Sequence, residues 1–540
     1  MNRRDFLEWT TAGTAQAMVA GRVLAESPKP ARPAPAPFRI RPFEWEEATL
    51  ADLQAAMAAG RQTAVSLTQA YVRRIEDLDQ RGPALRSVLE VNPDALAIAR
   101  DLDRERKAKG PRSPLHGIPI LIKDNIGTHD RMTTTAGSLA LLGCVPPRDS
   151  FVVQRLREAG AVILGKTNLS EWANFRGFRS SSGWSARGGQ TNNPYALDRN
   201  PSGSSSGSAV AVAASLCPAA LGTETDGSII SPASFCGIVG IKPTVGLISR
   251  YGIVPITHTQ DTAGPMARTV RDAALLLGAM TGVDPRDATT QSSRDKAHGD
   301  YTLFLDPNGL RGARIGVARR FFHSHSPGAK VLETSLDEMK RLGATLVDPA
   351  DDPPLGRFDD AEMTVLLYEL KADLNAYLAS LGPQAPVRSL KEAIEFNERN
   401  RDKEMPYFGQ EIFLQAQEKG PLTDKAYLDA LERCRRLSRD EGLDAVMDRH
   451  QLEALVAPSG GPADRTDLLY GDRDAGGSSS PAAVAGYPNI TVPAGYVFGL
   501  PVGISFFGRA YSEPTLLRLA FAFEQATKVR RAPTFAPSVG

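Results

Sequence analysis

The sequence predicts an α/β fold in which helices cover a mixed or mostly parallel central sheet. Amphipathic stretches with helical spacing alternate along the chain with short apolar runs of strand length. A hydrophobic content of 42% over 540 residues is enough for one large buried core. We therefore expect a single large domain over residues 43–535, interrupted by a more charged, helical insertion at about 311–448.

The segment before this domain has the pattern of an export signal followed by a linker. Asn2-Arg-Arg-Asp-Phe-Leu7 resembles a twin-arginine export signal, although an ordinary helix with two basic residues is the alternative. The mildly apolar stretch that follows, 10–20, is short for a membrane helix. We expect a signal peptide over 1–25, export to the periplasm or medium, and a Pro-rich linker over 26–42.

In the first half of the domain, elements of both kinds follow one another. Periodic apolar positions predict helices at 49–59, 66–78, 151–159 and 208–214. Short apolar runs predict strands ending at Lys123 and spanning 161–164 and 236–242. Gly160 ends the third helix, and a Gly/Ser-rich turn begins the fourth.

The second half begins with the insertion and returns to strands. Helices are expected at 333–342, 359–381, 390–401 and 424–448, packed over one end of the sheet. Strands at 455–457, 489–493 and 502–508 then precede a helix at 513–527. Elements that shape a substrate site are often carried on such insertions.

Two serines and one lysine point to nucleophilic chemistry. Ser204 lies in Ser202-Gly-Ser-Ser-Ser-Gly-Ser208, and Ser228 lies 24 positions later in Thr223-Glu-Thr-Asp-Gly-Ser-Ile229. Lys123 ends the apolar run Gly117-Ile-Pro-Ile-Leu-Ile122. A hydroxyl needs a base to become a nucleophile, and burial lowers the pKa of a lysine because it disfavours the charged form. A Gly/Ser-rich loop or a strand-end lysine alone is weak evidence, but together they predict a Ser-Ser-Lys triad.

The turn that carries the second serine also predicts an oxyanion hole. The backbone N–H groups of Thr225, Asp226, Gly227 and Ser228 can converge on the point where a tetrahedral oxyanion forms. Such preorganised donors commonly supply the largest single contribution to catalysis.

These motifs, with Asp261-Thr-Ala-Gly-Pro-Met-Ala-Arg268 after them, resemble those of the amidase signature hydrolases. The resemblance covers about 43–527 and is weakest between roughly 320 and 440. The run Gly222–Ile229 looks most like the branch of bacterial peptide amidases. The resemblance implies hydrolysis of linear carboxamides to a carboxylate plus ammonia or an amine, with C-terminally amidated peptides as one substrate class and no cofactor.

The resemblance also implies residue roles. Ser228 is the nucleophile that becomes acylated, Ser204 follows a cis peptide bond and relays the proton, and Lys123 is the base. Many members carry an aspartate and an arginine where this chain has Glu224 and Ile230, so an ion pair made elsewhere cannot form here. This separates the chain from the glutaminase component of tRNA amidotransferases, which stays an alternative. A fatty-acid amide hydrolase and a non-catalytic binding protein are the others.

Several other functions find little support. Gly160–Thr167 matches the phosphate-loop pattern, but its central residues predict a strand whose N–H groups are committed to a sheet. A net charge of +1 gives no electrostatic case for nucleic acid or an anionic membrane as partner. His323 and His325 lie close together without a metal-binding motif, and we expect no metal. The four cysteines show no zinc spacing and are expected to be buried thiols. The sequence does not predict the oligomeric state or the acyl and amine specificity.

Overall fold

The computed structural model describes residues 40–323, 327–351, 355–473 and 476–539. The expected signal peptide, 1–25, and residues 26–39 of the expected linker lie outside the described residues.

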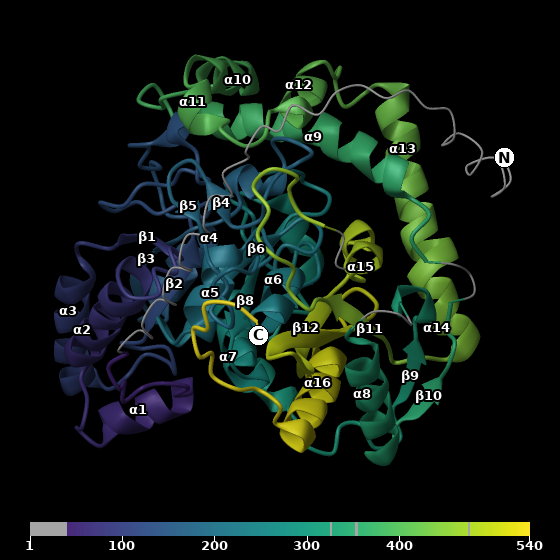
Figure 1. Cartoon of the computed structure of the whole chain (residues 1–540), viewed down its shortest axis with the longest axis horizontal. Helices are drawn as coiled ribbons and strands as arrows, with labels where there is room; N and C mark the ends of the chain where they lie inside the picture. Colours follow the sequence, from purple (N-terminus) through teal and green to yellow (C-terminus); the bar gives the residue numbers. More distant parts are fainter. Residues whose placement is uncertain (1–39, 324–326, 352–354, 474–475, 540) are drawn as a thin grey trace, which may run out of the picture. The chain divides into compact units, whose positions relative to one another are not determined.

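In the described part of the chain, eleven strands form one mixed sheet that runs through the body (Figure 1). β2 is parallel to its neighbours β3 and β6, β9 is parallel to β10 and β11, and the other pairs are antiparallel. The predicted mixed α/β sheet is therefore confirmed. The strand order is β1 (Val88–Val91), β3 (Val162–Thr167), β2 (Pro119–Lys123), β6 (Ala219–Glu224), β8 (Thr262–Ala267), β7 (Val239–Lys242), β12 (Asn489–Val497), β13 (Leu500–Phe507), β11 (Ala454–Gly460), β9 (Arg314–Val317) and β10 (Thr345–Val347).

Helices cover both faces of this sheet and extend beyond one end of it. The short α5 is buried along its whole length against the central strands, because it contains only small and β-branched residues. The α-helices are α1 (Leu50–Ala58), α2 (Ala64–Ile75), α3 (Ala95–Lys109), α4 (Phe151–Glu158), α5 (Ser206–Ala213), α6 (Ile230–Phe235), α7 (Val270–Met280), α8 (Ala329–Arg341), α9 (Asp359–Ser380), α10 (Leu390–Arg399), α11 (Arg401–Glu404), α12 (Glu411–Gln417), α13 (Lys425–Arg435), α14 (Asp444–His450), α15 (Ser480–Ala485) and α16 (Glu513–Thr527).

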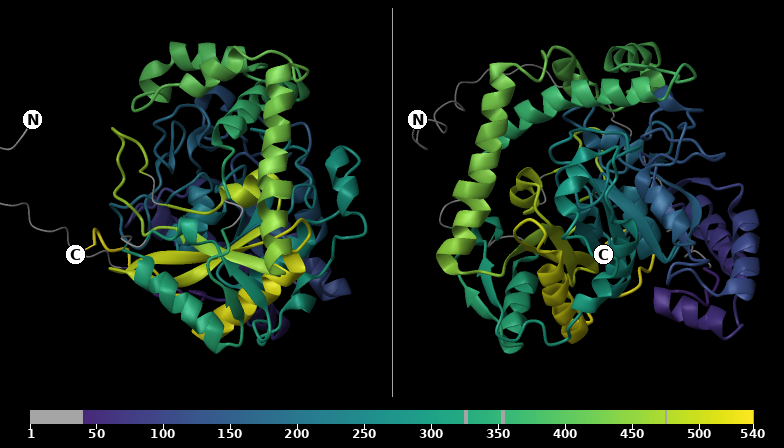
Figure 2. Two further views of the ribbon diagram at one scale, coloured as in Figure 1. Left: turned by 90° about the vertical axis from the view of Figure 1, so that its right-hand side faces the viewer. Right: turned by 180° about the vertical axis from the view of Figure 1, so that it is seen from behind.

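The expected insertion at 311–448 divides into two parts. Its first part adds β9 and β10 to the sheet, with α8 between them in the chain, and Ile315 and Val317 of β9 are fully buried. Its second part, α9 to α12, lies beyond one end of the sheet, and α13 leads from there back toward α14 (Figures 1 and 2). The helical covering over one end of the sheet therefore begins at about residue 359, later than the sequence indicates.

The remaining expectations concern cysteines and membranes. All four cysteines are buried free thiols, as expected. Among the described helices, none is both long enough and apolar enough to cross a bilayer.

Candidate active site

The site forms where the parallel strands β2 and β6 end side by side. Ile122 pairs with Leu221, so Lys123 and the residues after Leu221 reach the same edge of the sheet. Lys123 has no solvent-exposed surface. Its Nζ lies 2.8 Å from the Ser204 hydroxyl, 2.8 Å from Oγ1 of Thr223 and 3.2 Å from the Thr223 carbonyl oxygen. The structure thus brings the predicted lysine and the first predicted serine into direct contact.

Burial sets the protonation of this lysine. Loss of hydration lowers the pKa of Lys123 to about 7 from its ordinary 10.5, and the negative charges of Asp261 and Glu224 oppose the fall. Near neutral pH a large fraction of Lys123 is therefore an uncharged amine that is able to accept a proton.

The hydrogen bonds around Lys123 also orient its lone pair. A neutral amine has two N–H donors and one lone pair, and the Thr223 carbonyl can only accept. Oγ1 of Thr223, which also accepts from Nδ2 of Asn125 at 2.9 Å, takes the second N–H. The lone pair then faces Ser204, whose hydroxyl donates to it. Thr223 opens the motif that carries Ser228, and Asn125 lies two positions after Lys123, but the sequence gives no sign that either orients the lysine.

The two serines come from adjacent segments. Ser204 is fully buried, and the Gly203–Ser204 peptide bond is cis, as the family resemblance implies. Ser228 lies in the turn between β6 and α6, and its carbonyl accepts from the backbone N–H of Ser205 at 3.1 Å. Among the described residues no hydrogen bond joins the two serine hydroxyls directly. Ser228 is the member of the predicted triad that keeps some exposure, 7%, as a group that meets a substrate must.

Glu224 fixes the turn that carries Ser228. One oxygen of its buried carboxylate accepts from the N–H groups of Ile229 and Ile230, at 2.7 and 2.9 Å, where α6 begins. An acidic side chain at a helix N-terminus is favourable because the first N–H groups have no partner within the helix. Sequence reasoning noted only the ion pair that Glu224 cannot form. An acidic residue just before a helix was the available signal for this contact.

The predicted oxyanion donors remain available. Across the described residues, no hydrogen bond to protein engages the N–H of Asp226, Gly227 or Ser228. Gly227 has a φ of +76°, a conformation that favours glycine, and a Cβ there would lie 3.0 Å from Oγ of Ser479. Thr225 turns its hydroxyl away from this set and donates it to Asp261 at 2.6 Å. The backbone N–H of Thr225 likewise has no hydrogen-bond partner among the described residues, so the turn can present all four predicted N–H groups to an anionic oxygen.

The phosphate-loop match at Gly160–Thr167 is structural. The run enters β3, and the side chain of Lys166 is fully buried. Its Nζ donates to the Ile126 carbonyl at 2.6 Å and to Oγ1 of Thr134 at 2.8 Å. The backbone is thus committed to the sheet, as the sequence indicates, and the lysine side chain is committed within the core as well.

A cavity of about 360 Å³ adjoins the site. Thr223 and Thr225 line it on the side of β6. Its other walls are the segment 250–258, which we call the strap, the second half of α9 and the loop 146–148. Thr223, which contacts Nζ of Lys123, thus also lines the cavity, and Thr225 lies three positions before Ser228 in the same turn.

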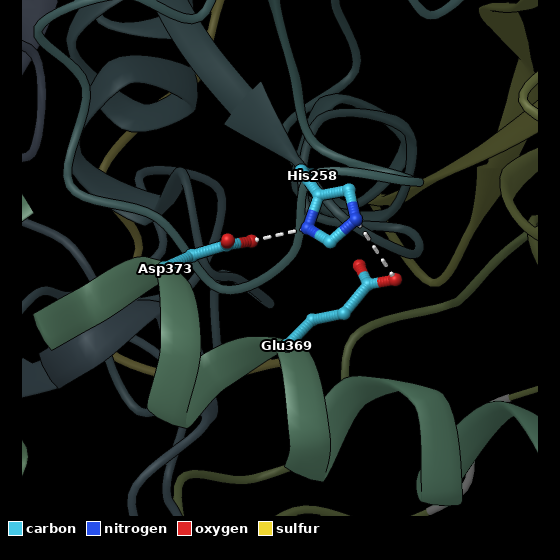
Figure 3. Close-up of side chains that lie close together, drawn as sticks. All are labelled: His258, Glu369 and Asp373. Carbon is cyan, nitrogen blue, oxygen red and sulfur yellow. Dashed lines mark hydrogen bonds and ion pairs between the residues drawn. The ribbon is translucent and has the colours of Figure 1, made fainter. Parts of the chain in front are cut away.

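His258 joins the strap to α9 (Figure 3). Its Nδ1 lies 2.8 Å from Asp373, and its Nε2 lies 3.5 Å from Glu369. Burial lowers the pKa of His258, but the hydrogen bond and charge of Asp373, with Glu369, raise it above its ordinary value overall. A metal ion would take one ring nitrogen together with both carboxylates. Here each nitrogen faces its own carboxylate, which is the arrangement of a protonated imidazolium.

Comparison with known proteins places this geometry in context. A family model described as Amidase matches residues 66–517. A probable amidase of Arabidopsis thaliana is 46% identical, over 91% of this chain and 92% of its own length. The solved peptide amidase of Stenotrophomonas maltophilia is 51% identical, with a TM-score of 0.86, over 92% of this chain and 100% of its own. A glutamyl-tRNA(Gln) amidotransferase subunit of Chloroflexus aurantiacus is 37% identical, over 90% of this chain and 98% of its own length.

Proposed function

The chain belongs to the amidase family, and from this premise we propose that it removes the terminal carboxamide of short peptides and related acyl amides as ammonia. As a member of this family it is an enzyme that hydrolyses amide C–N bonds. The finer substrate class is supported by the likeness to a peptide amidase over the whole of that chain.

We assign the chemistry to Lys123, Ser204 and Ser228. The observation that carries the assignment is the fully buried lysine, whose pKa is about 7 and whose Nζ lies 2.8 Å from Ser204. A positioned base with a pKa near the working pH is the best compromise between availability and strength.

The first half of the reaction forms an acyl-enzyme. The Ser228 oxygen attacks the amide carbon while its proton passes through Ser204 to the neutral Lys123. The carbonyl oxygen becomes an oxyanion, held by the N–H groups of the 225–228 turn. When the C–N bond breaks, Lys123 returns its proton through Ser204 to the leaving nitrogen, so ammonia departs neutral. Because amide nitrogen is a poor leaving group, this returned proton is as necessary as the attack.

The second half releases the acid. A water molecule attacks the acyl carbon, and the same two groups take its proton. The Ser228 oxygen then leaves and recovers a proton from Ser204. The products are the carboxylic acid and free enzyme. Ser204 and Ser228 need to approach each other during this cycle, because no direct hydrogen bond joins their hydroxyls in the described structure.

A covalent probe tests the assignment of the two serines. A fluorophosphonate is expected to label one site, on the peptide that contains Ser228. Ser204→Ala is expected to slow labelling without moving it, since only the relay is lost, and Ser228→Ala to abolish it. An adduct on Ser204, or labelling that survives in Ser228→Ala, would reverse the assignment.

One alternative has an observation in its favour. The 37% identity to a tRNA amidotransferase component raises a glutaminase function, in which the ammonia released from glutamine serves a partner. Glu224 and Ile230 at the two positions that differ from many family members, and the arginine pair near the N-terminus, favour the independent amidase. Ammonia released faster from free glutamine than from peptide amides would favour the glutaminase.

We also propose that the chain is exported by the twin-arginine route. Arg3 and Arg4, followed by the apolar stretch 10–20, support this destination.

A further inference from the structure

The cavity beside the site has walls of distinct character. Its polar residues near the site include Asn125, Thr223 and Thr225. The strap supplies the apolar side chains of Ile253, Val254, Pro255 and Ile256, and α9 adds Ala376 and Tyr377 beside Asp373 and Ser380. Ile253, Val254 and Ile256 of the strap are each between 6% and 8% exposed. A volume of about 360 Å³ lies at the low end of the ~300–1,000 Å³ usual for small-molecule sites, so it suits one large side chain and not a long peptide.

The acidic groups that border this cavity are already engaged by the protein. Asp261 accepts from Thr225 and from the strap N–H groups of Ile256 and Thr257. Asp373 is paired with His258 at 2.8 Å.

The arginines that line the cavity are also paired with other protein groups, except for one at the edge of the cavity. Arg250 is paired with Asp287 at 2.6 Å, and Arg286 with Asp284 at 2.8 Å. Arg148 is exposed, on the loop at the rim. A charged side chain deep in the cavity, away from Arg148 at the rim, would therefore lose its hydration while facing charged groups that are already paired, which is unfavourable. An uncharged apolar side chain loses little and buries its surface.

One buried polar atom at the inner end lacks a partner. Asn125 is 3% exposed and donates from Nδ2 to Thr223, but its Oδ1 accepts no hydrogen bond from any described residue. A buried acceptor left unsatisfied costs free energy unless a ligand or water supplies a donor. The cavity thus combines an apolar wall with an unfilled acceptor next to the lysine contact.

We propose that this cavity binds the apolar side chain of the acyl residue, so that the enzyme favours carboxamides of large aliphatic or aromatic acyl groups over small ones. The inference rests on the proposed function, in which ammonia is the leaving group. Ammonia needs no cavity of this size, so only the acyl part of the substrate is large enough to occupy it.

The walls are fixed before a substrate arrives. Oε2 of Glu369 on α9 accepts from the strap residue Thr257 and from Thr259 just after it. Asp261, directly before β8, fixes the same segment by accepting from the N–H groups of Ile256 and Thr257. A preformed apolar cavity discriminates by size, because neither wall has to be ordered on binding.

A filling substitution tests the inference. Ala376 on α9 lines the cavity at an exposed position, so Ala376→Phe adds a ring at the cavity wall without disturbing the core. Ala379→Phe is the matched control, with the same change on the same helix at an exposed position that does not line the cavity. Ammonia release is measured on N-acetyl-L-phenylalaninamide and N-acetylglycinamide.

We expect the wild-type enzyme and Ala379→Phe to prefer the phenylalaninamide in kcat/KM. Ala376→Phe is expected to lower that preference by ~10-fold or more, with the glycinamide rate kept, because a hydrophobic pocket discriminates on this scale. Ser380→Phe, at a second lining position that is exposed, should reproduce the effect if Ala376→Phe is poorly folded.

The opposing outcomes are distinct. An unchanged preference in folded Ala376→Phe and Ser380→Phe, or a wild type that does not prefer the larger acyl group, overturns the cavity assignment and leaves the amidase function intact. If the wild type releases ammonia from neither compound, the proposed function falls and the cavity assignment falls with it.

Discussion

The protonation state of Lys123 sets an acid limit on turnover. With a pKa of about 7, the neutral fraction is about 9% at pH 6, half at pH 7 and about 91% at pH 8. At its ordinary pKa of 10.5, only about 0.03% would be neutral at pH 7. Burial therefore raises the reactive fraction at neutral pH by about three orders of magnitude. We expect kcat/KM to rise about tenfold between pH 6 and pH 8.

The sign follows from the charge of the group. A base must be unprotonated to act, so activity is lost as pH falls through the Lys123 pKa. Glu224→Gln removes a negative charge that opposes the lowering of this pKa, so its acid limb is expected at a lower pH than that of the wild type. The variant keeps its place in the fold because one glutamine oxygen can still accept from both Ile229 and Ile230, as the single carboxylate oxygen does.

The assay is ammonia release from N-acetyl-L-phenylalaninamide between pH 5.5 and 8.5 at constant ionic strength, with thermal unfolding followed at each pH. Lys123→Ala is expected to lose about 10²- to 10⁴-fold in kcat/KM and to lose the acid limb with it. A folded Lys123→Ala that retains the wild-type limb, or a wild-type profile that is flat over this range, refutes the reasoning.

Three further outcomes follow from contacts or motifs described above. Glu224→Ala leaves two buried N–H groups without an acceptor, so the free energy of unfolding in urea should fall by about 2–6 kcal/mol, whereas Glu224→Gln should lose much less; equal losses contradict the capping role. His258→Gln should lower the Tm at pH 6 but hardly at pH 9, because stability from a raised histidine pKa is present below its ordinary value and is lost as pH rises through the folded value; the same loss at both pH values counts against the imidazolium. Replacing Arg3 and Arg4 by lysine should keep the precursor in the cytoplasm, and unchanged recovery from the periplasm excludes the twin-arginine route.

Local sequence patterns predict the elements well where the apolar pattern is clear. The helix expected at 513–527 matches α16, and the lysine-ended strand matches β2. The strand expected at 161–164 continues to Thr167. The side chain of Lys166 can be buried there because the Ile126 carbonyl and Oγ1 of Thr134 accept hydrogen bonds from its ammonium group. Gly165-Lys-Thr has the local pattern of a turn, and only these distant contacts override it.

The site was predictable to the extent that its residues lie in compact motifs. Lys123 and Ser204 meet as the motifs suggest. Thr223 and Asp261 open two of the motifs, and Asn125 lies two positions after Lys123. Their contacts cross separate segments, so the sequence gives no sign of what each will face. The helical covering begins later than the sequence predicts for a similar reason. β9 and β10 are short strands inside a charged zone, and they form because β9 pairs with β11 and β10 pairs with β9 at the edge of the sheet.

A lysine that serves as the base without a histidine needs influences on its pKa that oppose each other and are of similar size. Full burial alone would lower the pKa of Lys123 further and weaken it as a proton acceptor, while a carboxylate in direct contact would keep it charged. The structure avoids both extremes. The groups that touch Nζ are neutral oxygens of Ser204 and Thr223, whereas Asp261 and Glu224 act by charge without a hydrogen bond to it. The Glu224 carboxylate is held by the turn that carries Ser228, and the Asp261 carboxylate is held by the strap. The elements that position the oxyanion donors and line the cavity therefore also influence the pKa of the base.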